Sequence, residues 1–402
     1  MAKHILVVTQ HFWPENFRVN DLVEGLVEDG CQVDVLCGLP NYPKGEWFDG
    51  YGYTGPRRQE YAGARVFRSG EIRRKGNTGL RIFLNYCYWP VSALFSLSRL
   101  KGQYDAVLCY NTSPVMMALP ALVYGKLKKV PVTTYVLDLW PENLYSVLPV
   151  KNPLLRAIAH RVSDWFYRRA DKLIAMSSSL GARLTQRTGK SAEKIAVIPQ
   201  YCEDFYARPA LDPDLVRQYE GKFLLVFTGN FSPAQSLDTV IRAAALAHGD
   251  CPSLHLLLVG DGMSRSSLEA LVKELNAGEF VSFYGSVPPT QIPAIAGAAQ
   301  GLVVSLGDSP DLGLTVPAKV ASYMAMGKPI LASMNGEGYA AVKESGAGLV
   351  SPAADVKALA ANMKALAETS SPERETMGQK AREYYKAHYD RATLLKQLEK
   401  FI

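Results

Sequence analysis

Short apolar runs alternate along the chain with longer segments whose apolar residues recur at helical spacing. Strands are predicted at the apolar runs, six in each half of the chain: 5–9, 32–37, 105–109, 132–136, 172–176, 194–199, 223–229, 254–260, 281–284, 301–306, 329–333 and 348–350. Such alternation is typical of parallel sheets covered by helices on both faces. The sequence therefore predicts an α/β protein with two doubly wound parallel-sheet domains.

A polar stretch at 203–221 interrupts the alternation and reads as a linker. We expect one domain over 1–203 and a second over 204–379, with the last helix, about 380–402, packing back on the first domain. A chain of 402 residues agrees with two domains. Ligands of doubly wound sheets bind beyond the carboxyl ends of the strands, so we expect the site in a cleft between the domains.

One unit in the second half has the features of a phosphate site. A loop with Gly313 follows an apolar strand, Thr315 stands at the expected N-cap, and Pro317 stands in the first turn of a helix that ends at Gly327. The N-terminus of a helix presents free N–H groups and a positive dipole to an anion. Lys319 adds a full positive charge there. The alternative is an ordinary strand–helix unit with a lysine on its surface.

Several classes of protein are excluded by missing motifs. The six cysteines are scattered without a CxxC pair, which indicates a reducing compartment and no zinc site. The chain has no G-x-x-x-x-G-K-[ST] and no G-x-G-x-x-G after its first strand, which argues against an NTPase and a dinucleotide dehydrogenase. No signal-peptide pattern opens the sequence. We expect no cofactor and no metal.

The net charge of +6 is unevenly distributed. Residues 57–101 hold ten basic and two acidic side chains, and within them 82–98 is uncharged and aromatic. Basic and aromatic residues together suit an anionic membrane surface. The alternative is a core helix, because the apolar residues of this stretch fall at helical spacing. No nucleic-acid-binding motif is present. The residues predicted to meet the membrane or the acceptor are Arg73, Arg74, Lys75 and Trp89.

Motifs at the predicted strand ends resemble a known family. In chain order, Thr228-Gly-Asn, Leu258-Val-Gly-Asp-Gly, Phe283-Tyr-Gly-Ser-Val and Pro317-Ala-Lys-Val-Ala-Ser-Tyr-Met-Ala-Met-Gly-Lys-Pro-Ile resemble retaining glycosyltransferases of family four. The segments 10–18, 41–45 and 138–142 resemble a narrower subgroup, the N-acetyl-L-fucosamine and colanic-acid transferases of bacterial surface polysaccharides.

The resemblance implies two Rossmann-like domains facing across a cleft, the GT-B architecture. It also implies a nucleoside-diphosphate sugar donor, commonly linked to UDP, which is a substrate and not a cofactor. The implied acceptor is a saccharide on polyprenyl diphosphate, and the implied product belongs to O-antigen, capsule or exopolysaccharide. An N-acetylated deoxyhexose is the expected sugar, transferred with retained configuration and without a metal. Such an enzyme would be a peripheral protein at the cytoplasmic face of the inner membrane.

The sequence departs from the wider family at several positions. Leu314 and Ser322 stand where two glutamates are usual, and Asn230 and Gln235 stand where an arginine and a lysine grip the diphosphate. Leu137 replaces a common histidine, and Asn16-Phe-Arg18 replaces a glycine pair. We expect a rewired site in which Lys319, Arg18 and the helix dipole stabilise the diphosphate.

Catalytic roles are predicted for two residues. Lys319 would stabilise the departing diphosphate, and Asp138 would orient a hydroxyl of the donor or acceptor. The alternative for Asp138 is a turn residue before Trp140. The predicted donor-binding residues are Asn16, Arg18, Asn230, Gln235, Gly260, Asp261, Gly262, Val287, Gly313, Leu314, Thr315 and Ser322.

Two other functions are compatible with the same architecture. A nucleotide-sugar epimerase would need carboxylates or a histidine for proton transfer, and only His11 lies in a loop expected near the cleft. A non-catalytic scaffold would bind membrane without affinity for a nucleotide sugar.

Overall fold

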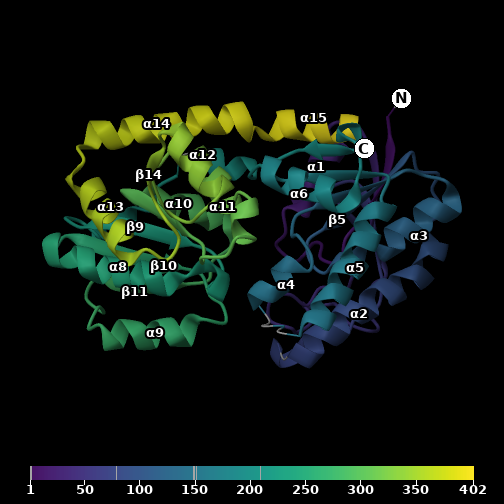
Figure 1. The fold of residues 1–402 in the computed structure, drawn as a ribbon, viewed down its shortest axis with the longest axis horizontal. Helices are drawn as coiled ribbons and strands as arrows, with labels where there is room; N and C mark the ends of the chain where they lie inside the picture. Colours follow the sequence, from purple (N-terminus) through teal and green to yellow (C-terminus); the bar gives the residue numbers. More distant parts are fainter. Residues whose placement is uncertain (1, 78, 148–149, 151, 209) are drawn as a thin grey trace. The chain divides into compact units, whose positions relative to one another are not determined.

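The computed structural model describes residues 2–402 except 78, 148, 149, 151 and 209 (Figure 1). The chain divides into two compact units, one of residues 1–198 and 392–402 and one of residues 199–391. Each unit contains its own parallel sheet. The division falls five residues before the boundary predicted at 203/204.

The first unit contains an eight-stranded sheet in the order β3-β4-β2-β1-β5-β6-β7-β8. All neighbours pair in parallel except β3 and β4, which form an antiparallel edge. At its centre Val7 lies between Val35 and Leu108, and all three are fully buried. The strands are β1 His4–Val8, β2 Gln32–Cys37, β3 Arg58–Tyr61, β4 Ala64–Arg68, β5 Ala106–Asn111, β6 Val132–Val136, β7 Lys172–Ala175 and β8 Ile195–Val197.

Helices of this unit connect the parallel strands. They are α1 Val19–Glu28, α2 Gly79–Ser96, α3 Leu119–Lys128, α4 Glu142–Val147, α5 Pro153–Arg169, α6 Ser178–Thr188 and α15 Arg391–Phe401, most of which belongs to this unit. A short 3-10 segment, η3 Val115–Ala118, packs against both α2 and α5. The ammonium of Lys3 donates to the carbonyls of Glu399 and Ile402 at 2.5 and 3.1 Å, which ties α15 to the segment before β1.

The second unit contains a six-stranded parallel sheet in the order β11-β10-β9-β12-β13-β14. Its strands are β9 Phe223–Thr228, β10 Leu254–Val259, β11 Val281–Gly285, β12 Gly301–Ser305, β13 Ile330–Ser333 and β14 Gly348–Ser351. Its helices are α7 Pro213–Gln218, α8 Leu237–Asp250, α9 Arg265–Glu274, α10 Ile292–Gly297, α11 Ala318–Met326, α12 Glu337–Ser345, α13 Val356–Glu368 and α14 Ser371–His388. The central strands β9 and β10 are buried at every residue, as expected for a parallel sheet covered on both faces, whereas the edge strands β11 and β14 are mostly half-buried.

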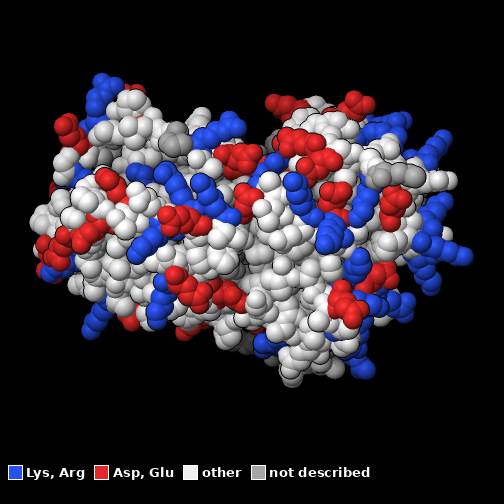
Figure 2. All heavy atoms as spheres, turned by 90° about the horizontal axis from the view of Figure 1, so that it is seen from above, with Lys and Arg blue, Asp and Glu red and all other residues white. Residues whose placement is uncertain are grey.

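The C-terminal region is two helices and not the single one predicted. α14 packs on α11 in the second unit, where residues 380–391 therefore belong, and only the residues from 392 onward join the first unit. A Cβ at Gly378 of α14 would lie 2.2 Å from the carbonyl oxygen of Gly327, so this contact requires glycine. Figure 2 looks from the α14 side of Figure 1 and shows basic and acidic side chains interspersed on that face.

Candidate functional site

Loops at the carboxyl ends of β9, β10, β11 and β12 come together in the second unit. The N–H of Gly260 donates to the carbonyl of Gly285 at 2.8 Å, and that of Gly229 donates to Val259 at 2.8 Å. The N–H of Phe231 donates to Asp261 at 2.8 Å. A Cβ at Gly260, whose φ is +140°, would lie 1.9 Å from the carbonyl oxygen of Gly229. The backbones of these loops therefore approach one another more closely than any side chain would permit.

Lys319 lies in the first turn of α11 and reaches back to the loop after β9. Its ammonium donates a hydrogen bond to Oε1 of Gln235 and lies 3.8 Å from the centroid of the Phe227 ring. A Cβ at Gly229 would lie 3.0 Å from its Cε. The structure thus brings together the predicted catalytic residue Lys319 and the predicted donor-binding residue Gln235, which are 84 positions apart.

The charge of Lys319 is not neutralised by a neighbour. Among the described residues no carboxylate forms an ion pair with it, and burial alone lowers the pKa of Lys319 to about 7. A cation that has lost water and has no counter-ion favours an anionic ligand, because the ligand would restore the lost electrostatic stabilisation. This half-buried amine is the strongest indication of an anion site in the second unit.

The N-cap of helix α11 lies two residues later than predicted. Pro317 is the N-cap residue and makes no side-chain cap hydrogen bond. The N-cap role predicted for Thr315 is therefore wrong, because the first helical residue is Ala318 and Thr315 lies two residues before the cap. The end at Gly327, with φ of +66°, is confirmed. The buried hydroxyl of Tyr323 accepts from the N–H of Thr228 at 2.9 Å and fixes α11 against the end of β9.

The other predicted residues of the second unit differ in exposure. Ser322 is buried, with its hydroxyl directed to the carbonyl of Ala318 at 3.4 Å. Asn230 and Asp261 are exposed, and Oδ1 of Asp261 accepts from the N–H of Gly262 at 2.7 Å. The remaining predicted positions are half-buried: Gln235, Gly260, Gly262, Val287, Gly313, Leu314 and Thr315.

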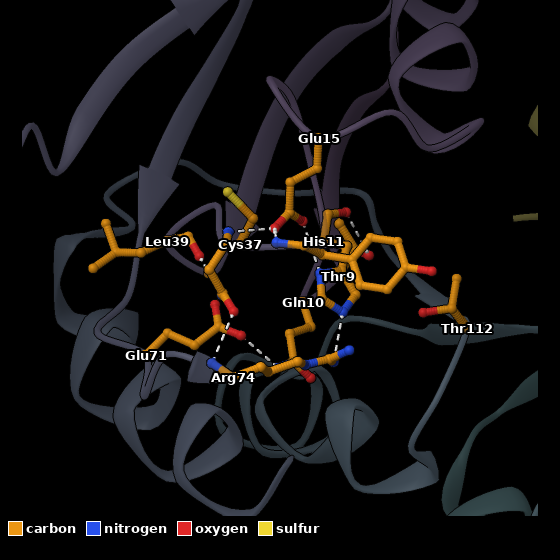
Figure 3. A network of polar contacts seen from close by, with 12 residues as sticks. Thr9, Gln10, His11, Glu15, Cys37, Leu39, Glu71, Arg74 and Thr112 are labelled. Carbon is orange, nitrogen blue, oxygen red and sulfur yellow. Dashed lines mark hydrogen bonds and ion pairs between the residues drawn. The ribbon is translucent and has the colours of Figure 1, made fainter. Parts of the chain in front are cut away.

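The first unit contains a buried polar network at the carboxyl ends of its central strands (Figure 3). Nδ1 of His11 lies 2.7 Å from Oε2 of Glu15, and Nε2 of His11 lies 3.0 Å from the guanidinium of Arg74. Since a guanidinium only donates, Nε2 accepts and Nδ1–H donates to Glu15. Burial lowers the pKa of His11, which agrees with a neutral ring. Both ring nitrogens are engaged, so His11 connects Arg74 to Glu15 and is not free to transfer a proton.

The network continues from Arg74 to three residues that the sequence analysis missed. Nε of Arg74 donates to Oδ1 of Asn85 at 3.0 Å, and Asn85 donates to Oε1 of Glu71 at 2.8 Å. Gln10 donates to the same Oε1 at 2.6 Å. Burial, followed by the charge of Glu15, raises the pKa of Glu71 to about 8, so Glu71 is mainly protonated at neutral pH. The signal in the sequence was Asn85, an amide side chain between apolar and aromatic residues in the uncharged stretch 82–98.

This network corrects part of the predicted membrane contact. Arg74 and Trp89 are 6% and 0% exposed, so the prediction that they meet a membrane surface is wrong. Arg74 is enclosed between the rings of Tyr42 and Tyr86, and α2 turns Trp89 inward. Arg73 is half-buried and pairs with Glu46 at 2.6 Å, while Lys75 is exposed.

Asp138 follows β6 in the first unit. It is half-buried, and burial raises its pKa to about 7, against the opposing effect of a hydrogen bond from Asn143. Beyond it, Trp140 donates through Nε1 to Ser113 at 2.9 Å. Glu142 begins α4 and pairs with Arg187 at 3.0 Å, which is a structural role. Asp138 is the acid of this loop that is not held by an ion pair among the described residues.

Asn16 and Arg18, predicted to bind the donor, lie in the loop after β1. Asn16 is exposed, and Arg18 is half-buried at the N-cap position of α1. Both belong to the first unit. Their role toward a donor remains a prediction. No cluster of three or more metal-ligating side chains is present among the described residues, and none of the helices described is long and apolar enough to cross a membrane.

Comparison with known proteins assigns both units. Residues 16–200 match the glycosyl transferase 4-like domain, and residues 213–384 match the glycosyl transferases group 1. The probable glycosyltransferase WbjE of Pseudomonas aeruginosa is 24% identical over 62% of each chain. The putative colanic acid biosynthesis glycosyl transferase WcaI of Escherichia coli is 22% identical over 80% of this chain and 81% of its own. The match thus spans less than two thirds of WbjE.

Solved structures share the fold over nearly the whole chain. Sucrose-phosphate synthase from Thermosynechococcus elongatus has a TM-score of 0.78 at 19% identity, covering 99% of this chain and 98% of its own. Anabaena HepE in complex with UDP has a TM-score of 0.70 at 15% identity, with the same coverage. The two parallel-sheet units are therefore the two Rossmann-like domains of the GT-B fold, as predicted. With both domain models matched in order, the chain belongs to the group 1, family-four-like glycosyltransferases.

Proposed function

We propose that this glycosyltransferase moves a sugar from a UDP-linked donor to a saccharide carried on polyprenyl diphosphate, in the synthesis of a bacterial surface polysaccharide. The observation that carries the proposal is the amine of Lys319, unpaired with any described carboxylate, beside Gln235 and the loop after β9. Support also comes from WbjE and WcaI, the relatives named above, and from a structural neighbour that binds UDP. An N-acetylated deoxyhexose is the sugar we propose.

The second unit supplies the chemistry of the leaving group. In the transfer, the bond between the anomeric carbon and the diphosphate oxygen breaks, and its electron pair stays with the diphosphate. Lys319 in its charged form would stabilise that oxygen, together with the dipole at the N-terminus of α11. Gln235 aims the ammonium and contributes no charge of its own. Lys319 would thus bind the donor diphosphate in place of the lysine that the wider family usually has at the position of Gln235.

The first unit would act on the hydroxyl groups. Asp138, half-buried and without an ion-pair partner in the described chain, would orient a hydroxyl of the acceptor or donor. We propose transfer with retention of configuration and without a metal or cofactor. The enzyme would work as a peripheral protein at the cytoplasmic face of the inner membrane, where a polyprenyl-linked acceptor is reached. An epimerase gains no support, because both nitrogens of His11 are engaged.

The test measures thermal stabilisation by UDP, GDP and their sugars, since a bound ligand raises the melting temperature by mass action. We expect UDP to stabilise the wild-type protein and to stabilise Lys319→Met much less. A second assay follows UDP release with and without a polyprenyl-diphosphate saccharide. Release that depends on the acceptor supports the transferase. Isomerised donor without any acceptor would contradict it, as would the absence of nucleotide binding.

A further inference from the structure

Helices α2 and α5 of the first unit present large apolar side chains to solvent. On α5 these are Leu154, Leu155, Ile158, Val162 and Trp165, exposed by 41% to 68%. The spacing of these positions places them within one sector of the helix. Leu154, Leu155 and Ile158 have exposed fractions of 68%, 55% and 50%. An apolar helix face of this kind ordinarily packs against something.

Helix α2 carries a second stripe of the same kind. Phe83, Leu84, Tyr88, Val91 and Phe95 are exposed, and the last four recur at intervals of four, three and four residues. Trp89 and Ala93, on the opposite side, are fully buried. Since α2 and α5 both pack on the four-residue segment η3, the two stripes belong to neighbouring elements. We call these ten exposed apolar residues of α2 and α5 the docking face.

Basic side chains accompany the docking face. Helix α5 carries three exposed arginines beside this sector, Arg161, Arg168 and Arg169, and one acid, Asp164. A fourth arginine, Arg156, lies on the other side of the helix over the ring of Tyr145. Asp164 is held by Arg187 at 2.7 Å and also lies 3.8 Å from Arg168, which leaves Arg161 and Arg169 without an acid on this helix. The α2 stretch 82–98 contains no charged residue. The face therefore combines apolar side chains with a positive surplus, the combination that anionic lipid surfaces attract.

The charges also distinguish between possible occupants. In a symmetric dimer the same patch meets itself, which would place the arginines of one copy opposite those of the other. Like charges at such a contact are unfavourable. Trp165 and Tyr88 have an apolar ring and a polar group, as is common for side chains at the level of lipid headgroups. An anionic bilayer fits these features, whereas a second copy of this chain does not.

We propose that the docking face binds the surface of an anionic membrane, with the apolar side chains of α2 and α5 among the headgroups and the arginines of α5 at the lipid phosphates. The inference rests on the proposed function, because an enzyme that uses a polyprenyl-linked acceptor must bind that acceptor at a bilayer. The surface differs from the predicted segment 73–75, in which Arg74 is buried. It places lipid contact on helices in the first unit.

The experiment is sedimentation of the full chain with vesicles of phosphatidylcholine alone or mixed with phosphatidylglycerol. The wild-type protein should bind the mixed vesicles and release them as salt rises, because salt screens exposed charges. Arg161→Gln with Arg169→Gln should weaken binding about thirtyfold, since each basic side chain near such a surface contributes about 1 kcal/mol. Leu154→Ser, Leu155→Ser and Ile158→Ser combined should weaken it by on the order of tenfold or more.

The matched control removes three exposed apolar side chains from the second unit, Leu211, Val216 and Leu246, by serine substitutions. It should bind vesicles as the wild type does. All variants are checked for unchanged melting temperature and for stabilisation by UDP, so that loss of membrane binding is separated from loss of donor binding.

Three results would overturn the proposal: no binding of the wild type to mixed vesicles, equal binding by the α5 serine variant, or equal loss in the control. A dimer that dissociates in the α5 serine variant, without vesicle binding, would assign the face to a second copy. Vesicle binding without any stabilisation by UDP would refute the proposed function and leave the membrane inference standing.

Discussion

Replacing Lys319 with methionine removes the charge and keeps most of the side-chain volume. Within the described part of the chain, the ammonium contacts Gln235 and the ring of Phe227, and burial lowers its pKa to about 7. About half of the molecules then carry the charge at pH 7, and about one in a hundred at pH 9. If a diphosphate binds only the charged form, the affinity of the wild-type protein for UDP falls about fiftyfold between these pH values.

The assay is calorimetric titration with UDP at pH 7, 8 and 9, in buffers that differ in ionisation enthalpy. Binding should raise the pKa of Lys319 again, so at pH 8 and above we expect uptake of nearly one proton for each UDP bound. Lys319→Met should bind UDP on the order of tenfold to a hundredfold more weakly at pH 7. This factor corresponds to the free energy of one hydrogen bond to a charged group, which the variant loses.

The methionine variant is also the control for titration of the nucleotide itself, because its affinity should vary little above pH 7. An affinity of the wild type that is equal at pH 7 and pH 9, with no proton uptake, would refute the reasoning. It would mean that Lys319 does not meet the diphosphate, or that its amine stays charged in the free protein.

Two further predictions concern acids of the first unit. Asp138→Asn should keep the UDP-induced rise in melting temperature and lose most transfer, and near-wild-type turnover would remove Asp138 from the mechanism. The folded-state pKa of Glu71 is raised from 4.5 to about 8, so its contribution to stability is full below pH 4.5 and is lost as pH rises toward 8. This loss in the free energy of unfolding is at most about 1.4 kcal/mol per pH unit. Glu71→Gln, which mimics the protonated acid, should reduce the loss when the free energy is measured by urea unfolding at several pH values. Equal slopes for the two proteins between pH 5 and 8 would show that Glu71 is ionised in the fold.

The strands at the centres of both sheets were predictable because parallel strands are covered on both faces and need unbroken apolar runs. β9 and β10 are of this kind, fully buried at every position. The hairpin of β3 and β4 was missed for the converse reason. β3, with the sequence Arg-Gln-Glu-Tyr, is an edge strand whose residues are alternately exposed and half-buried, so it has no apolar run.

The sequence by itself determined the order of strands and helices, the loops that follow each strand, and Lys319 at the start of α11. These depend on local patterns of apolar and polar residues and on turn chemistry. Whether a charged side chain is buried depends instead on partners far along the chain. Arg74 meets His11 across 63 positions, and Lys319 meets Gln235 across 84. Only tertiary structure decided that Arg74 is enclosed in a network while the apolar residues of α5 face solvent, because burial is set by the packing of distant segments and not by the residue's own type.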